Sequence, residues 1–184
     1  CESSADDIGL YQIAERAGIP PASVYHFFPA REAAFLALAQ HYLGQFEALG
    51  TGVAPDDVVG WQAWMSWEQR LGMEFYNAHL PALKLFLGGF GGEDTRKANR
   101  EWNVRAGRLA ARRFELLFHM PEPLDSDRLF HLAIEIVDAI WAASYLRHGR
   151  ITEDYFQDAQ DAAIAFCRLY LPEHLASRAP PVGG

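Results

Sequence analysis

The chain has 184 residues, half of them apolar and 13% aromatic, so it is long and apolar enough to bury one sizeable core. A formal net charge of −8 and an isoelectric point near 5.3 exclude a uniformly basic surface, although a local basic or polar face stays compatible with them. The chain has two cysteines and no C-x-x-C pair, which excludes a disulfide framework, argues against a thiolate zinc site and fits a reducing cytoplasm. No run of apolar residues is long enough to predict a membrane-spanning helix.

Helical patterns run along the whole chain, whereas the alternating Val, Ile and Thr runs of strands do not occur, which predicts an all-α protein. A first short helix is expected to end at about Ala17, because Gly18 follows as a helix-terminating glycine. Pro20 and Pro21 suit the first turn of a second short helix, which Pro29 ends. Further helices are expected at about residues 30–49, 57–79, 82–86, 95–119, 126–148 and 152–171.

The stretch IAERAGIPPASVYHFFPAREAAF, residues 13–35, joins the first helices through a glycine turn. A helix, a glycine turn and a second helix are typical of a helix-turn-helix motif, whose second helix enters the major groove of DNA. We expect Ala17 and Gly18 to let the two helices approach closely, with Ile19 and Val24 packed beneath. The outward face of the second helix would then carry Pro21, Ala22, Ser23, Tyr25 and His26.

The combined string I-A-x-x-A-G-I-x-x-x-S-V-Y-x-x-F-x-x-R-E resembles the DNA-binding head of the tetracycline-repressor (TetR) family over about residues 8–40. The resemblance implies that Ser23 and Tyr25 contact the DNA backbone and that His26 contacts the backbone or the bases. It also implies that Arg31, where the family usually has a lysine, offers a cation to a phosphate. The pattern of helix, turn and helix alone would equally fit a bundle that binds no DNA and keeps these rings in its core.

The head departs from the family pattern in three respects. The family's helix before the motif is absent here or reduced to CESS, so we expect the N-terminus to be incomplete. Residues 1–35 hold Arg16 and Arg31 against five acidic residues, although phosphate contacts need positive charge, so either the preceding segment supplies it or binding is weak. Phe27 places an apolar ring where the family often has a polar one.

The resemblance divides the chain into a helix-turn-helix DNA-binding domain over residues 1–46 and a ligand-binding and dimerisation domain over residues 47–184. In the family the second domain commonly binds a small inducer among its central helices, which requires large apolar walls with few polar groups. The alternative is an ordinary core, since Trp61, Trp64 and Trp67 repeat at helical spacing. The ligand-binding candidates are Trp61, Trp64, Met65, Glu68, Phe75, His79, Trp102, Phe114 and Trp141.

The helix expected at residues 126–148 is apolar on two stripes and therefore needs burial on two sides. Together with the last helix, it could form a four-helix interface between two subunits, and two-fold symmetry is also what a palindromic operator requires. The alternative is that both helices are buried within the monomer. The expected interface residues are Phe130, Ile134, Val137, Trp141, Ala159, Ala162 and Phe166.

No pattern supports catalysis, because the glycine-rich GGFGGEDT follows no strand and the histidines form no metal-binding pair. The sequence therefore predicts a cytoplasmic, ligand-responsive repressor, without catalytic residues, metal or cofactor, that a small apolar or aromatic molecule releases from its operator. Its expected partners are double-stranded DNA, a small effector and a second copy of the chain, and no membrane. The rival hypothesis is an all-α ligand-binding or scaffold protein without DNA binding, and whether regulation is repression or activation stays open.

Overall fold

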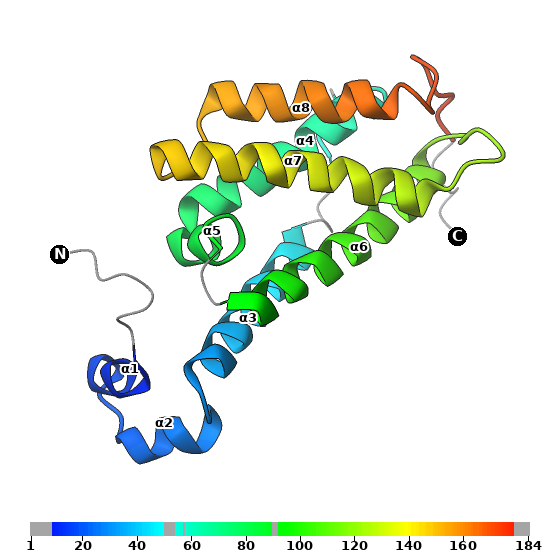
Figure 1. The fold of residues 1–184 in the computed structure, drawn as a ribbon. Coiled ribbons are helices and arrows are strands. Elements are labelled where there is room, and N and C mark those ends of the chain that lie inside the picture. The colour runs from blue at the N-terminus through cyan, green and yellow to red at the C-terminus, as the bar shows by residue number, and fades with distance from the viewer. Residues whose placement is uncertain (1–8, 50–53, 57, 90–91, 179–184) are drawn as a thin grey trace.

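The computed structural model describes residues 9–49, 54–56, 58–89 and 92–178, and within these ranges every regular element is a helix (Figure 1). The predicted all-α fold class is therefore confirmed. The helices are α1 (Leu10–Ala17), α2 (Pro21–Phe27), α3 (Arg31–Leu49), α4 (Trp61–Ala78), α5 (Leu80–Phe86), α6 (Gly92–Leu117), α7 (Ser126–His148) and α8 (Glu153–Cys167).

Local signals in the sequence set most of the helix ends. Gly18 ends α1 with a φ of 67°, and Gly149 ends α7 with a φ of 70°, both in the left-handed region that favours glycine. Pro21 and Pro81 lie in the first turns of α2 and α5, where a missing backbone N–H costs nothing. Asp125 caps α7 by accepting a hydrogen bond from the backbone N–H of Arg128 at 3.0 Å.

α1, α2 and the start of α3 form a small head at one end of the molecule, and α3 leads from it into the body (Figure 1). The head has its own core, in which Leu10, Ala14 and Val24 are buried together, separate from the core of the body. The division predicted after residue 46 falls inside α3, which is one continuous helix as far as Leu49, and it stays a prediction.

In the body, α6 packs against α7 along much of its length, and α7 packs against α8 (Figure 1). The largest fully buried side chains are Trp61, Phe114 and Phe156, which come from α4, α6 and α8. The segment after α8 folds back over this core, since the indole N–H of Trp61 donates to the carbonyl of Pro172 at 2.9 Å. One core therefore joins the central helices to the last residues that the structure describes.

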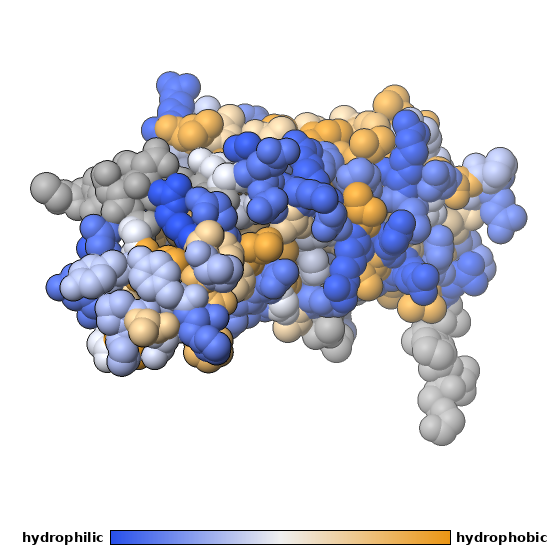
Figure 2. All heavy atoms as spheres, turned by 60° about the horizontal axis from the view of Figure 1, so that its bottom comes forward, coloured by the Kyte–Doolittle hydropathy of each residue, from blue (hydrophilic) through white to orange (hydrophobic). Residues whose placement is uncertain are grey.

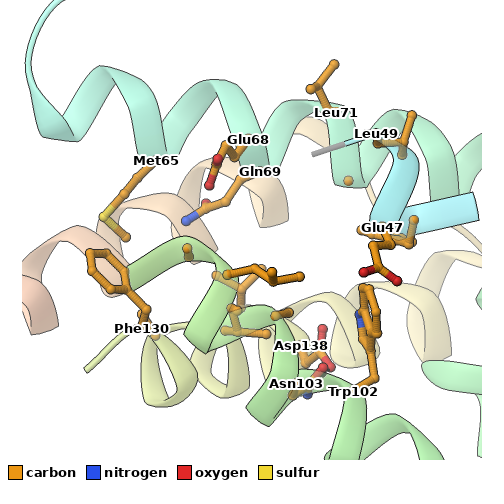
Figure 3. Close-up of a pocket in the computed structure, with 18 of the residues that line it drawn as sticks. Glu47, Leu49, Met65, Glu68, Gln69, Leu71, Trp102, Asn103, Phe130 and Asp138 are labelled. Carbon is orange, nitrogen blue, oxygen red and sulfur yellow. Dashed lines mark hydrogen bonds between the residues drawn. The ribbon is translucent and has the colours of Figure 1, made fainter. Parts of the chain in front are cut away.

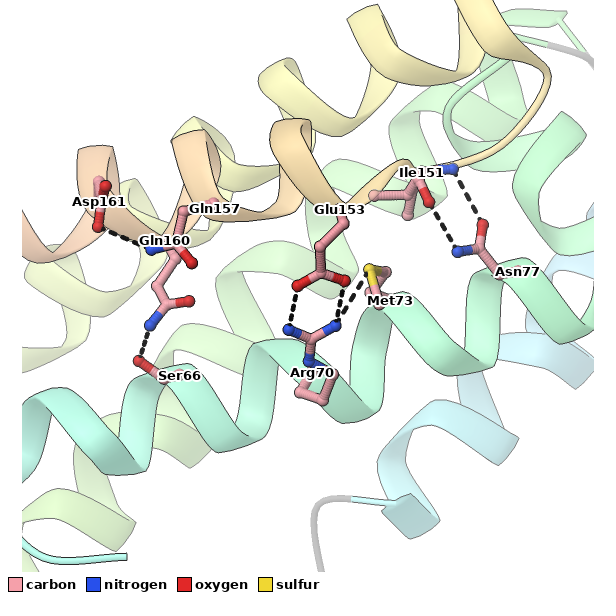
Figure 4. Close-up of polar contacts among 9 residues, drawn as sticks. All are labelled: Ser66, Arg70, Met73, Asn77, Ile151, Glu153, Gln157, Gln160 and Asp161. Carbon is pink, nitrogen blue, oxygen red and sulfur yellow. Dashed lines mark hydrogen bonds and ion pairs between the residues drawn. The ribbon is translucent and has the colours of Figure 1, made fainter.

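Polar contacts hold α4 against α8 and the turn that precedes it (Figure 4). The guanidinium of Arg70 donates to both carboxylate oxygens of Glu153 at 2.5 and 2.6 Å and lies 3.8 Å from the ring centroid of Phe156. Two turns further along α4, the side-chain amide of Asn77 donates to the carbonyl of Ile151 at 2.8 Å and accepts from its N–H at 2.9 Å. Asn77 thus satisfies both backbone groups of a buried residue between α7 and α8.

We expect Asn77→Ala to lower the free energy of unfolding by about 2 kcal/mol, because it leaves a buried N–H and a buried C=O of Ile151 unpaired. Urea denaturation followed by circular dichroism measures this loss. Gln157→Ala is the control, because its amide contacts only the neighbouring exposed carboxylate of Asp161 among the described residues. Equal stabilities of the two variants would contradict the structural role given to Asn77.

Candidate functional site

The turn between α1 and α2 is set by the backbone of Gly18. Its N–H donates to the carbonyl of Glu15 at 3.2 Å, and the N–H of Ile19 donates to that of Ala14 at 3.1 Å, so carbonyls at the end of α1 are satisfied. Apart from its two chain neighbours, no atom of the described part of the chain lies within 4 Å of the place that a Cβ on Gly18 would take. The glycine is therefore needed for its positive φ and not for close approach of the helices, which corrects the prediction made for Ala17 and Gly18.

The small core beneath the turn follows the prediction in part. Val24 is buried against Leu10 and Ala14, and Phe28 packs against this cluster. Ile19, which the sequence also predicts beneath the turn, is 46% exposed. It comes directly after the left-handed Gly18, which turns the chain away from the buried side of α1.

The α2 face, which we define as Pro21, Ala22, Ser23, Tyr25 and His26, is exposed at all five positions. Val24 is the buried residue of this helix, so one side of α2 holds the head together and the rest meets solvent. Beyond this face, Phe27 is 74% exposed and packs edge-on against the His26 ring, with 5.3 Å between centroids. Figure 2, which brings this end forward, shows mostly pale, weakly polar side chains over the head at the left of the view.

Positive charge on the described head is balanced by negative charge. Arg31 begins α3, is half-buried, and donates from Nε to the Glu32 carboxylate at 3.3 Å. Within residues 9–40 the other charged side chains are Arg16 and Glu15, again one of each sign. The α2 face thus carries exposed polar and apolar groups, and the nearby cation Arg31 on α3 already has the carboxylate of Glu32 beside it.

A cavity of about 200 Å³ lies in the body between the end of α3 and helices α4, α6 and α7. Its walls are mainly apolar and aromatic, with Phe46, Tyr76 and Phe130 among the rings. Figure 3 shows Glu68 and Gln69 projecting from α4 toward α6 and α7. Apolar walls with a few inward polar groups are typical of sites for small organic molecules.

The structure brings five of the nine ligand-binding candidates to this cavity and places four elsewhere. Those that line it are Met65, Glu68, Trp102, Phe114 and Trp141. Those outside its lining are Trp61, Trp64, Phe75 and His79.

The four other candidates have packing roles that explain their positions. Trp61 is fully buried and bonded to the C-terminal segment, and Trp64 packs edge-on against Trp67 with 5.4 Å between ring centroids. Phe75 stacks on His79 at 4.3 Å between centroids, and both rings meet Tyr42 of α3. Trp61, Phe75 and His79 thus contact segments outside α4, whereas Trp64 packs on a ring of α4 itself. None of the four lines the cavity, and their role in ligand binding stays a prediction.

Polar groups of the cavity are partly paired. Glu68 forms an ion pair with Arg113, yet burial raises the pKa of its carboxyl more than the guanidinium lowers it. Asp138 accepts a hydrogen bond from Asn103 at 2.8 Å, and burial raises the pKa of its carboxyl as well. The predicted candidates include neither Asp138 nor Gln69, because periodicity does not distinguish a buried polar residue from a solvated one on the same helix.

Most residues predicted for the dimer interface are buried within the monomer, and the interface itself stays a prediction. Phe130, Val137, Trp141 and Ala159 are buried inside the monomer, and Ile134 lines the cavity. Ala162 and Phe166 are half-buried on α8 and could still contact another molecule. The monomer alone accounts for the burial of Phe130, Val137 and Trp141 on the inward stripe of α7.

The outward stripe of α7 is apolar throughout and is at least partly exposed. We call it the outer stripe, and its residues are Leu132, Ile136, Ala139, Ala143 and Leu146. By length and composition alone, α7 is the one helix in the described ranges that is long and apolar enough to cross a bilayer. Core helices of soluble proteins meet the same criterion, so the length and composition of α7 are weak evidence for a membrane span. About a third of its most apolar part is buried in the monomer, which leaves an exposed apolar surface on this helix.

No protein-family model matches the sequence, and no curated protein matches it either. Among solved structures, the chain is similar to a TetR transcriptional regulator from Rhodococcus sp. RHA1, with a TM-score of 0.62 and 18% sequence identity over 94% of this chain and 90% of that chain. The chain has the TetR fold. The similarity covers both the head and the body of the chain. The sequence resemblance is confined to the head, whereas the structural similarity also includes helices α4 to α8.

Proposed function

We propose that the protein is a ligand-responsive, DNA-binding transcriptional regulator that acts as a repressor in the cytoplasm. The observation that carries this proposal is the α2 face, an exposed set of short and aromatic side chains on the second helix of a helix-turn-helix head in a TetR fold. A second helix presented in this way fits the major groove of double-stranded DNA.

Within the head, each candidate has a role that its position permits. Pro21 and Ala22 would meet base edges, because they begin the helix that enters the groove. Ser23 and Tyr25 would donate hydroxyl hydrogen bonds to phosphates, as would His26 from its ring. Arg31 would bring a cation to the backbone at the start of α3.

A homodimer would cover the outer stripe and would carry two DNA-binding heads. Ala162 and Phe166 of α8 are half-buried, and Leu169, just beyond that helix, is 75% exposed, so they could extend the same apolar surface. Two copies of α7 and α8 would form a four-helix interface around a two-fold axis, which matches the symmetry of a palindromic operator.

We expect Leu146→Glu to weaken dimerisation by at least about tenfold, because it places a charge within an apolar interface. Leu116→Glu on α6 is the matched control, since both leucines are 75% exposed in the monomer and only Leu146 lies on the outer stripe. Sedimentation velocity across a concentration series measures the effect. Equal dissociation constants for the two variants would contradict an interface on this stripe.

Ligand binding in the cavity would act on the head through α3. This helix begins at Arg31 in the head and ends at Leu49 on the cavity wall, so one rigid element touches both sites. A ligand that favours the conformer in which two heads no longer fit successive major grooves would release DNA by a population shift.

An electrophoretic mobility shift of the full-length protein on its own upstream DNA tests the function. We expect a complex at low salt that survives excess nonspecific competitor. The balanced charge of residues 9–40 favours the rival, an all-α ligand-binding or scaffold protein without DNA binding. The absence of any shift at low salt would decide for that rival.

A further inference from the structure

Two residues that line the cavity between α4 and α7 each carry a buried polar atom without a partner among the described residues. Within the described ranges, three buried side-chain atoms have no hydrogen-bond partner, namely Gln69 Oε1, Asn99 Oδ1 and Trp141 Nε1. Gln69 and Trp141 both line the cavity. Because buried polar groups in folded proteins are almost always hydrogen-bonded, an unpaired acceptor and an unpaired donor at one cavity indicate a molecule that supplies both bonds.

The walls indicate the shape of that molecule. The rings of Phe46, Tyr76, Trp102 and Phe114 line the cavity, and aromatic walls favour a flat aromatic guest by stacked or edge-on contact. The volume is about 200 Å³, whereas an engineered apolar cavity of about 150 Å³ holds one benzene molecule. One ring or two fused rings therefore fit the space.

The charges of the lining argue against an anionic guest. Glu47, Glu68 and Asp138 line the cavity, and Arg113 is the basic residue among the described lining residues. Arg113 is already paired with Glu68, so a carboxylate guest would find no cation to spare and would meet the buried carboxyl of Asp138. A neutral guest avoids both costs.

We propose that the effector is a neutral, planar aromatic molecule of one or two fused rings that donates one hydrogen bond to Gln69 Oε1 and accepts one from Trp141 Nε1. This inference rests on the ligand-responsive part of the proposed function. A lactam or amide fused to an aromatic ring has this chemistry, because its N–H and C=O lie side by side.

Equilibrium dialysis with three two-ring probes tests the proposal. Quinolin-2-one carries the donor and the acceptor, naphthalene has the same shape without them, and 2-naphthoate adds a negative charge. We expect quinolin-2-one to bind at least about tenfold more tightly than either of the others, since each satisfied buried group contributes about that factor. Binding of 2-naphthoate as tight as that of quinolin-2-one, or no binding of any probe, would overturn the proposal.

Two variants test the residues themselves. Gln69→Met removes the acceptor and Trp141→Phe removes the donor, and each should lower the affinity for quinolin-2-one about tenfold while changing that for naphthalene less than twofold. Gln157→Met and Trp64→Phe are matched controls outside the cavity lining, and they should leave both affinities unchanged. Thermal unfolding of each variant separates a lost contact from a lost fold, and unchanged quinolin-2-one affinity in folded Gln69→Met and Trp141→Phe would contradict the assignment.

Failure of this inference and failure of the proposed function give different results. Dialysis uses the protein without DNA, and the mobility shift uses it without any probe. If the protein shifts DNA but does not prefer quinolin-2-one, the proposed regulator function is supported and this effector class is contradicted. If the protein binds quinolin-2-one through Gln69 and Trp141 but shifts no DNA, this ligand class is supported and the proposed regulator function is contradicted.

Discussion

Gly107→Ala is expected to lower the free energy of unfolding by about 3 kcal/mol, which corresponds to a fall in Tm of about 6 to 12 °C. Gly107 lies in the middle of α6, where a Cβ would come within 2.6 Å of the backbone N of His131 and 2.7 Å of its Cα on α7. Real Cβ atoms do not approach so closely, and backbone atoms cannot rotate away as a side-chain tip can. The two helices would have to move apart along their shared core.

Gly44→Ala provides the control for this substitution. Gly44 also lies inside a helix, α3, but, apart from the adjacent backbone of α3 and its two chain neighbours, no atom of the described residues stands within 4 Å of the position of an added Cβ. Alanine there should raise stability by up to about 1 kcal/mol, because it favours the helix over the unfolded chain. Urea denaturation of both variants separates the two effects, and a Gly107→Ala protein as stable as Gly44→Ala would show that α6 and α7 do not cross here.

The second large expected effect is a loss of DNA affinity caused by substitutions at two positions of the head. We expect Arg31→Ala to weaken operator binding about tenfold and to reduce the slope of log affinity against log salt by about one, because one phosphate contact is lost. Tyr25→Phe should weaken binding by a similar factor, since a hydrogen bond to a charged group is lost, and should leave the salt slope unchanged. Fluorescence anisotropy over a salt series measures both quantities.

Arg112→Ala is the matched control for charge, because it removes the same cation from the outside of α6. It should leave both the affinity and the salt slope as in the unchanged protein. If Arg112→Ala weakened binding as much as Arg31→Ala, general electrostatics would account for the binding and the head would lose its special role.

Local signals made the helices and their ends predictable. Glycine and proline act within one turn, so Gly18 and Pro21 mark the ends of α1 and α2 without reference to the rest of the chain. The helix expected at residues 126–148 matches α7 at both ends for the same reason. The head string likewise predicted the exposed α2 face, because its residues are neighbours in the sequence.

The orientation of α7 could not be predicted in this way. By helical periodicity alone, the stripe with Phe130 and Val137 and the stripe with Ile136 are equally apolar, so either could face the core. The choice depends on α6, where Gly107 lets the backbone of α7 at His131 approach. That contact joins residues far apart in sequence, so periodicity alone does not tell which stripe of α7 the monomer buries.

The cavity shows the same limit. Trp61 and Met65 lie on one helix at helical spacing, but Trp61 is turned to Pro172, a residue 111 positions away, while Met65 lines the cavity. Gln69 has no sequence signal at all, since its importance comes from an oxygen that burial leaves without a partner. Long-range packing decides which side chains reach a cavity. The contacts between distant residues that make up this packing cannot be predicted from one sequence.

Site-specific photo-crosslinking tests most directly whether α2 meets DNA. The photoreactive p-benzoylphenylalanine replaces Phe27, which is 74% exposed at the end of α2, and in a second protein it replaces Leu116, which is 75% exposed on α6. We predict a covalent adduct with upstream DNA from position 27 and none from position 116. Equal yields from the two positions, or an adduct from position 116 alone, would contradict DNA binding through the head.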